Sequence, residues 1–132
     1  MVWCHAGPVI GPDRTTGLFA SVSTDAMEVS AEAAKWAFAD TGGMPGVVIL
    51  TDSIYAIAIA KAGKLKKTIE ALGGTVLEDV DKPIADTSNR MPARTTALLQ
   101  KYGASWTHAL AIKETYFNFM CPSLAAAGNT VR

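Results

Sequence analysis

The chain has 132 residues, of which 49% are apolar and 18% are charged. This length suits one domain with one core, and this composition excludes a disordered chain. Lys and Arg together number 12, as do Asp and Glu, so no excess of positive charge indicates a nucleic-acid partner, and we expect none.

The beginning of the chain differs from the rest. Residues 1–16, "MVWCHAGPVIGPDRTT", have a short apolar start followed by glycines and prolines that interrupt regular structure. We therefore expect a strand stub and a connecting loop over 1–16. From residue 17 onward, apolar runs alternate with segments of helical period, which predicts a single α/β lobe over 17–132.

The first two strand and helix units have clear end signals. "GLFASVS" predicts a strand, and Asp25 with Glu28 three residues later predicts the capped start of a helix. "GVVIL" predicts a second strand, followed by a helix over 54–72 with Leu72 as the last residue of its buried face. Gly73 should end this helix in the left-handed conformation.

Two further units follow. "TVLEDV" predicts a strand, and Pro92 suits the first turn of the next helix, with Ser88 or Asn89 as its cap. "THALAI" predicts a fourth strand in which His108 is structural, and Pro122 should break or kink the helix after it. The closing "NTVR" has the pattern of the opening of another strand.

Four consecutive strand and helix pairs predict a mainly parallel sheet with helices on both faces, a Rossmann-like three-layer sandwich. Ligands of such sheets bind at the carboxyl ends of the strands, where Asp52, Tyr55 and Tyr116 are expected. Carboxylates, amides and aromatic rings suit a small polar solute such as a sugar. For Asp25, Ser53 and Ser88, helix capping alone is a sufficient explanation, and we favour it over a contact with the ligand.

No pattern of an enzyme is found. The sequence has no GxSxG elbow, no GxGxxG after a strand and no Walker A lysine, and neither histidine has an evident nucleophile or metal partner. Cys4 and Cys121 lack the spacing of a zinc site. We expect no enzymatic activity, no metal and no cofactor.

From residue 17 onward, the order of these pieces resembles the C-terminal lobe of type I periplasmic solute-binding proteins. These are sugar-type receptors of ABC transporters, and LacI-type repressor effector domains share their fold. The resemblance is carried by "FASVSTDAMEVSAEAAKWA", "GVVILTDSIYAIAIAKAGKLKKTIEALGGTVLED", "NRMPARTTALLQKYG" and "THALAIKETYFNFMCPSLAAAG". It implies a periplasmic receptor that grips a solute between two lobes and delivers it to membrane permeases.

The resemblance also implies that the N-terminal lobe is missing from this chain, and that the isolated lobe forms a homo-oligomer through its uncovered surface. Lys113 and Glu114 stand where the family has an Asn-Asp pair, which brings a sugar acid into consideration beside a neutral sugar. Asn89 and Arg90 match a polar residue and an arginine of the family's third helix. The resemblance makes residues 1–16 the crossover strand stub and loop that follow the N-terminal lobe, and His5 lies near this crossover.

Two other functions stay open at this point. The chain could be the effector-binding domain of a LacI-type transcription regulator, which a DNA-binding motif upstream would indicate. It could instead be a self-contained flavodoxin-like signalling domain that binds magnesium. In such a domain, Asp52 would stand for an acidic residue after one strand and Lys113 for a lysine after a later strand. The sequence does not identify the solute, because the specificity of a cleft depends on both lobes.

Overall fold

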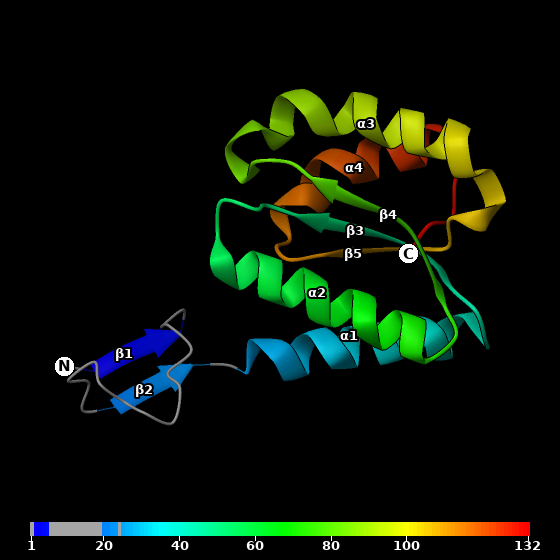
Figure 1. Ribbon diagram of the computed structural model, residues 1–132. Helices are drawn as coiled ribbons and strands as arrows, with labels where there is room; N and C mark the ends of the chain where they lie inside the picture. Colours follow the sequence, from blue (N-terminus) through cyan, green and yellow to red (C-terminus); the bar gives the residue numbers. More distant parts are fainter. Residues whose placement is uncertain (1, 6–19, 24) are drawn as a thin grey trace.

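The computed structural model describes residues 2–5, 20–23 and 25–132, with side chains for 25–132. A parallel sheet in the order β4-β3-β5 forms the middle layer, with strands β3 (Gly46–Thr51), β4 (Thr75–Asp81) and β5 (His108–Ala111). Two helices cover each face, as Figure 1 shows: α1 (Ala26–Thr41) and α2 (Ala56–Ala71) on one, α3 (Thr87–Tyr102) and α4 (Thr115–Ala126) on the other. The predicted α/β three-layer sandwich is confirmed.

The first predicted strand does not join this sheet. β2 (Ala20–Ser23) pairs in parallel with β1 (Val2–His5) in a separate two-stranded sheet. The expectation that every predicted strand would belong to one sheet is therefore wrong, because an apolar run indicates a strand but not its partner. The loop expected within 6–16 lies outside the described residues.

β3 is the central strand, and all of its residues are buried. Val47 and Ile49 face the layer of α1 and α2, whereas Val48 and Leu50 face the layer of α3 and α4. This alternation follows from the two-residue period of a strand, and burial on both faces explains the continuous apolar run "GVVIL". The sheet thus separates two apolar cores, one under each pair of helices.

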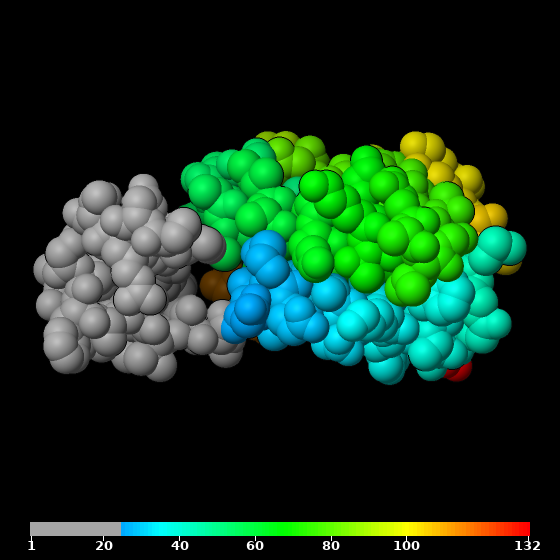
Figure 2. All heavy atoms as spheres, turned by 60° about the horizontal axis from the view of Figure 1, so that its bottom comes forward, coloured from blue at the N-terminus to red at the C-terminus, as the bar shows by residue number. Residues whose placement is uncertain are grey.

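The helix ends follow local chemistry. The Asp25 carboxylate accepts hydrogen bonds from the backbone N–H groups of Met27 and Glu28, each at 3.0 Å, so its capping role is confirmed. Gly73 has a φ of 89°, in the left-handed region predicted for it. Leu72 follows the last residue of α2 and is 37% exposed, so its expected place in the buried face was wrong. Figure 2 shows α1 and α2 side by side on one face of the molecule.

The prediction that Pro92 lies in the first turn of its helix was wrong, and Pro122 does not break α4. α3 begins at Thr87, whose hydroxyl donates to the carbonyl of Ile84 at 2.8 Å, so Ser88 and Asn89 lie inside its first turn rather than capping it. Pro92 is therefore inside the helix, and α4 likewise continues through Pro122. A proline removes one helical hydrogen bond, and the buried packing of these helices against the core offsets that loss.

The end of the chain runs beside β5. The N–H of Arg132 donates to the carbonyl of Thr107 at 3.0 Å, and its own carbonyl accepts from the N–H of Ala109 at 2.7 Å. These two bonds are the pattern of a parallel pair. No strand is assigned to residues 129–132, but this contact agrees with the strand opening expected there.

The Asp25 cap can be tested by substitution. Asp25→Ala should lower the free energy of unfolding by about 1 kcal/mol, because two N–H groups at the start of α1 lose their acceptor. Urea denaturation followed by circular dichroism measures this change. Asp25→Ser should retain most of the stability, and an unchanged midpoint for the alanine variant would contradict a capping role.

Candidate functional site

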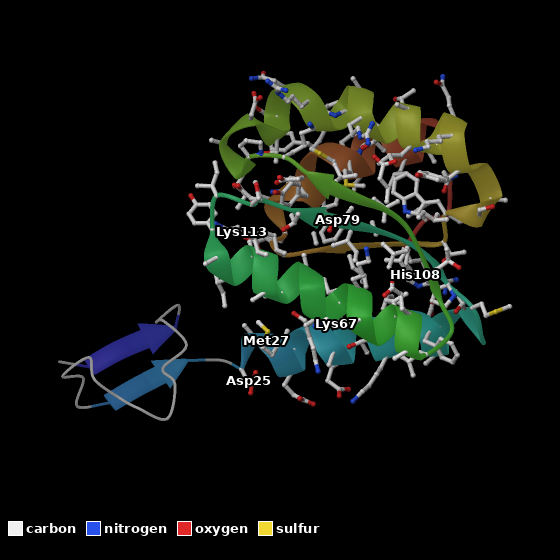
Figure 3. All side chains as sticks on the ribbon, viewed as in Figure 1. Asp25, Met27, Lys67, Asp79, His108 and Lys113 are labelled. Carbon is white, nitrogen blue, oxygen red and sulfur yellow. The ribbon has the colours of Figure 1, made fainter. Side chains whose placement is uncertain are left out.

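The carboxyl ends of β3, β4 and β5 meet at one end of the sheet, because the three strands are parallel (Figure 1). The loops to α2, α3 and α4 lie there, and we call this end the carboxyl edge. Figure 3 shows Lys113 at this edge and His108 at the opposite one. Six predicted site residues belong to these loops or to the helix starts that follow: Asp52, Tyr55, Asn89, Arg90, Lys113 and Glu114. The seventh, His5, is in β1, where no side chain is described.

Asp52 is buried and fully engaged with the backbone. Its side chain is 2% exposed, and its Oδ1 accepts from the N–H of Ile54 at 3.1 Å. Its Oδ2 accepts from the N–H of Ile84 at 2.9 Å, in the loop after β4. Asp52 therefore joins two loops of the carboxyl edge, and this position explains why an aspartate directly follows β3. The prediction that it contacts a solute has no support in this geometry.

A second aspartate adds to this connection. The N–H of Ser53 donates to Oδ1 of Asp81 at 2.9 Å, and contacts with Ser53 lower the pKa of Asp81. The N–H of Lys82 donates to the carbonyl of Thr51 at 2.9 Å. The sequence analysis did not select Asp81, although its place at the end of a neighbouring strand was a usable signal.

Tyr116 belongs to the core rather than to the surface of the carboxyl edge. Its ring is fully buried, and its hydroxyl lies 2.9 Å from the carbonyl oxygen of Thr51 and 2.6 Å from that of Lys82. Burial, with Asp52 and Asp81 nearby, raises its pKa to about 12. The hydroxyl therefore connects α4 to the ends of β3 and β4.

Asn89 and Arg90 form one cluster with Asp86 at the start of α3. The Asn89 amide donates to Oδ1 of Asp86 at 3.2 Å, and Nε of Arg90 pairs with Oδ2. These contacts lower the pKa of Asp86. Asp86 offsets the unfavourable position of an arginine at a helix start, and the remaining guanidinium N–H groups stay on an exposed side chain.

The remaining candidates are exposed side chains of the two other loops. Tyr55 is 52% exposed just before α2, and Lys113 and Glu114 are exposed just before α4. Because β3 lies between β4 and β5, the Tyr55 loop is flanked by the loops that carry the other candidates. The carboxyl edge thus presents a phenol, a carboxylate, an amide and two cations to solvent.

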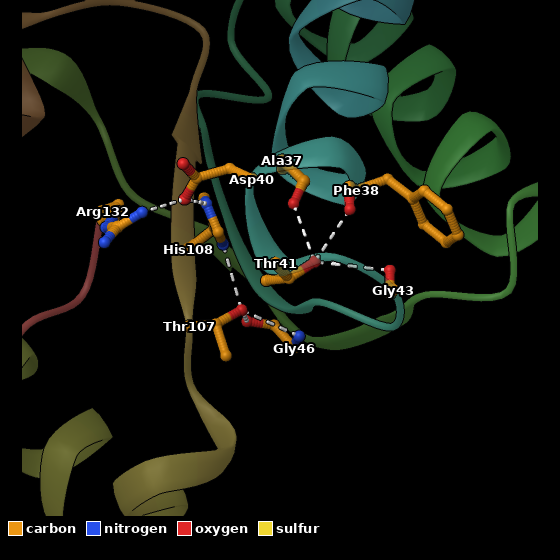
Figure 4. Close-up of polar contacts among 9 residues, drawn as sticks. All are labelled: Ala37, Phe38, Asp40, Thr41, Gly43, Gly46, Thr107, His108 and Arg132. Atoms are coloured by element: carbon orange, nitrogen blue, oxygen red, sulfur yellow. Dashed lines mark hydrogen bonds and ion pairs between the residues drawn. The ribbon is translucent and has the colours of Figure 1, made fainter.

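The opposite edge holds a polar cluster that the sequence did not predict. His108 is 1% exposed, with Nε2 at 3.2 Å from Asp40 and Nδ1 at 3.0 Å from the Thr107 hydroxyl (Figure 4). Arg132 also pairs with Asp40 at 2.5 Å, and this contact is the main cause that lowers the pKa of Asp40. A buried, structural His108 was expected, but its partner is 68 residues away in sequence and gave no local signal.

Within the described residues, no group of three or more His, Cys, Asp or Glu is placed to hold a metal ion. In the same part of the chain, no helix is long and apolar enough to cross a membrane. No family profile and no curated protein sequence matches the chain.

Solved structures share the fold. The sugar-binding protein of a sugar ABC transporter from Bacillus halodurans matches 96% of this chain with a TM-score of 0.81 and 15% identity. A twin-arginine translocation pathway signal protein from Burkholderia phytofirmans matches 96%, with a TM-score of 0.72 and 21% identity. An ABC transporter solute-binding protein from Agrobacterium vitis, with bound allitol, matches 82%, with a TM-score of 0.70 and 20% identity.

This chain has the fold of one lobe of a type I periplasmic binding protein. The matched parts make up 41%, 40% and 39% of those three chains, so this chain spans well under half of their length. The predicted resemblance to a lobe of this family is confirmed at the level of the fold. Two of the three proteins are named for binding a sugar or a solute and not for a reaction.

The structural role assigned to Asp52 predicts a loss of stability on substitution. Asp52→Ala should lower the free energy of unfolding by about 2 to 4 kcal/mol, because two partly buried N–H groups lose a charged acceptor. Chemical denaturation measures this loss. Ser88→Ala, at an exposed position of α3, should change it by less than about 0.5 kcal/mol, and equal effects of the two substitutions would contradict the assignment.

The raised pKa of Tyr116 predicts alkaline destabilisation. The folded protein binds the phenol proton up to pH about 12, whereas the unfolded chain releases it near 10.0. Stability from this group is therefore complete below pH 10 and is lost as the pH rises through that window. Denaturation midpoints at pH 9 and above measure the loss, and Tyr116→Phe should show a shallower decline. Identical alkaline slopes for the two proteins would contradict the prediction.

Proposed function

We propose that this chain is one lobe of a non-enzymatic solute-binding protein that delivers a sugar or related small polar solute to an ABC transporter. The observation that carries the proposal is the match of nearly the whole chain to the sugar-binding protein from Bacillus halodurans. The proposal includes a second lobe, a membrane permease as partner and a periplasmic location. Binding by such proteins requires closure of two lobes around the solute, so one lobe supplies only part of the contacts.

The solute contacts are assigned to exposed side chains of the carboxyl edge. Lys113 and Glu114 precede α4, Tyr55 precedes α2, and Asn89 and Arg90 lie on the first turn of α3. Their amide, carboxylate and cationic groups can form several hydrogen bonds with adjacent hydroxyls, and the Tyr55 ring can lie against the apolar face of a sugar. Asp52 acts indirectly, because its two backbone contacts hold the loops that carry these residues.

The charges favour a solute with an acid group. Arg90 shares its charge with Asp86, whereas Lys113 takes part in no ion pair within the described residues. An exposed ammonium group next to Glu114 can bind a carboxylate of the solute while Glu114 accepts from its hydroxyls. A sugar acid therefore uses both side chains, and a neutral sugar uses Glu114 more than Lys113.

The alternative of a magnesium-dependent signalling domain is disfavoured by Asp52. Both of its oxygens already accept backbone N–H groups, and its side chain is 2% exposed. Magnesium requires carboxylate oxygens that can enter an octahedral shell with several waters. Binding the ion at Asp52 would leave the N–H groups of Ile54 and Ile84 without their acceptor.

A thermal-shift experiment tests the proposed function. A protein that joins this lobe to a second lobe should gain several degrees in Tm with one class of sugar or sugar acid, since ligand at about 100 times Kd adds roughly 2.7 kcal/mol. Glu114→Gln should reduce the shift for all such solutes, and Lys113→Gln mainly that for sugar acids. Lys66→Gln, at an exposed position of α2, serves as the control and should leave it unchanged.

Two results would contradict the proposal. The first is a shift with magnesium in the single lobe that Asp52→Asn abolishes. The second is a solute-induced shift in the two-lobe protein that is insensitive to both Lys113→Gln and Glu114→Gln, which would remove these residues from the binding site.

A further inference from the structure

Lys61 differs from the other lysines of α2. It is half-buried, whereas the lysines further along the helix are exposed: Lys64, Lys66 and Lys67. Lys61 lines an apolar hollow of about 220 Å³, together with Leu65 of the same helix and Phe117 of α4. A lysine in such a place buries its methylene groups and directs its ammonium group to a polar partner.

The polar partner of Lys61 is a backbone carbonyl at the carboxyl edge. Its Nζ donates to the carbonyl oxygen of Ile112 at 2.9 Å, although the two residues are 51 positions apart in sequence. The N–H of Ile112 donates to the carbonyl of Leu50 in β3 at 3.1 Å. The Ile112 carbonyl belongs to the peptide group that joins Ile112 to Lys113. The ammonium group of Lys61 therefore lies against the backbone of the loop that carries Lys113 and Glu114.

The charge of Lys61 is not neutralised by a carboxylate in the described part of the chain. Neither Lys61 nor Lys113 takes part in an ion pair there, although Glu114 lies in the same loop. A half-buried charge is costly without a counter-ion, and a hydrogen bond to a neutral carbonyl offsets only part of this cost. The carbonyl of Ile112 also uses only one of the three donors of the ammonium group. Lys61 is thus a cation placed to attract an anionic group.

The charges at the carboxyl edge are distributed unevenly. The end of β4 and the segment that leads into α3 have equal numbers of cations and carboxylates: Asp81, Lys82, Asp86 and Arg90. Around the loop after β5, Lys61 and Lys113 are accompanied by the single carboxylate of Glu114. Unpaired positive charge is therefore found on the β5 side of the edge, and a solute with an acid group would be oriented by it.

We propose that Lys61 is a specificity-determining residue for solutes with an acid group. It adds its charge to that of Lys113, and its bond to the Ile112 carbonyl holds the loop that carries Lys113 and Glu114. The carboxylate of the solute faces β5 and α4, and its hydroxyls face the loops after β3 and β4. This inference rests on the proposed function, because it concerns the same solute.

An NMR titration of this chain tests the proposal. The probes are two matched pairs, glucuronate with glucose and galacturonate with galactose, and the amide shifts of Lys113 and Glu114 report weak binding by one lobe. The unmodified chain should prefer the acid of at least one pair. Lys61→Met should lower the affinity for that acid by at least about fivefold and change the affinity for the neutral sugar much less, since only the acid interacts with the lost charge.

Three further variants separate the charge of Lys61 from a structural role. Lys61→Gln keeps a hydrogen-bond donor without the charge and should lose the preference for the acid as Lys61→Met does. Lys61→Arg keeps the charge and should retain the preference. Lys64→Met, at an exposed position three residues further along α2, is the matched control and should retain it too. Circular dichroism confirms that each variant is folded, and higher ionic strength should weaken the preference of the unmodified chain.

Each of three results would overturn the proposal. One is an equal loss of affinity for both members of a pair in Lys61→Met, which is what a merely structural role predicts. Another is the absence of a preference for either acid in the unmodified chain. If the two-lobe protein still gains Tm with a sugar in either case, the proposed function stands and only the role of Lys61 falls. The last is a two-lobe protein that gains no stability with any sugar or sugar acid, in which case both fall.

Discussion

The carboxylate of Asp52 is the interaction on which the carboxyl edge depends. A buried carboxylate is costly unless hydrogen bonds replace its water, and here two backbone N–H groups do so, one from each of two loops. Tyr116 adds a hydroxyl in contact with the ends of both β3 and β4. The loops are thus fixed mainly by contacts to backbone atoms, and their outward side chains do not carry this role.

β3 provides the platform for this arrangement. Its position between β4 and β5 buries both of its faces, so its end is held on either side by a neighbouring strand. The carbonyl of Thr51, its last residue, also accepts the N–H of Lys82, which joins the end of β3 to the loop after β4. A rigid base of this kind is what a lobe needs if closure against a second lobe is to bring the same groups to the same solute each time.

Much of the fold could be predicted from the sequence because its signals are local. Asp25 and Gly73 act through neighbouring residues, and the run "GVVIL" records burial on both faces of one strand. Other features have no local signal. The pairing of β2 with β1 and that of His108 with Asp40 depend on residues distant in sequence. The start of α3 ahead of Pro92 depends on packing that outweighs a local preference. For the candidate site, the sequence located the edge but could not distinguish the buried Asp52 from the exposed Lys113 and Glu114, because burial is set by tertiary packing.

Because the loops are anchored through main-chain groups, the sequence of such a lobe can change during evolution without loss of the anchor. The amides that Asp52 accepts belong to Ile54 and Ile84, and any residue except proline would supply the same N–H. The side chain of Ile54, which is 70% exposed, can therefore be exchanged while the scaffold keeps its shape, whereas Ile84 also packs against the core. Descendants of one ancestral lobe could acquire new ligand preferences through a few substitutions in these loops, with Asp52 held constant by selection for folding alone.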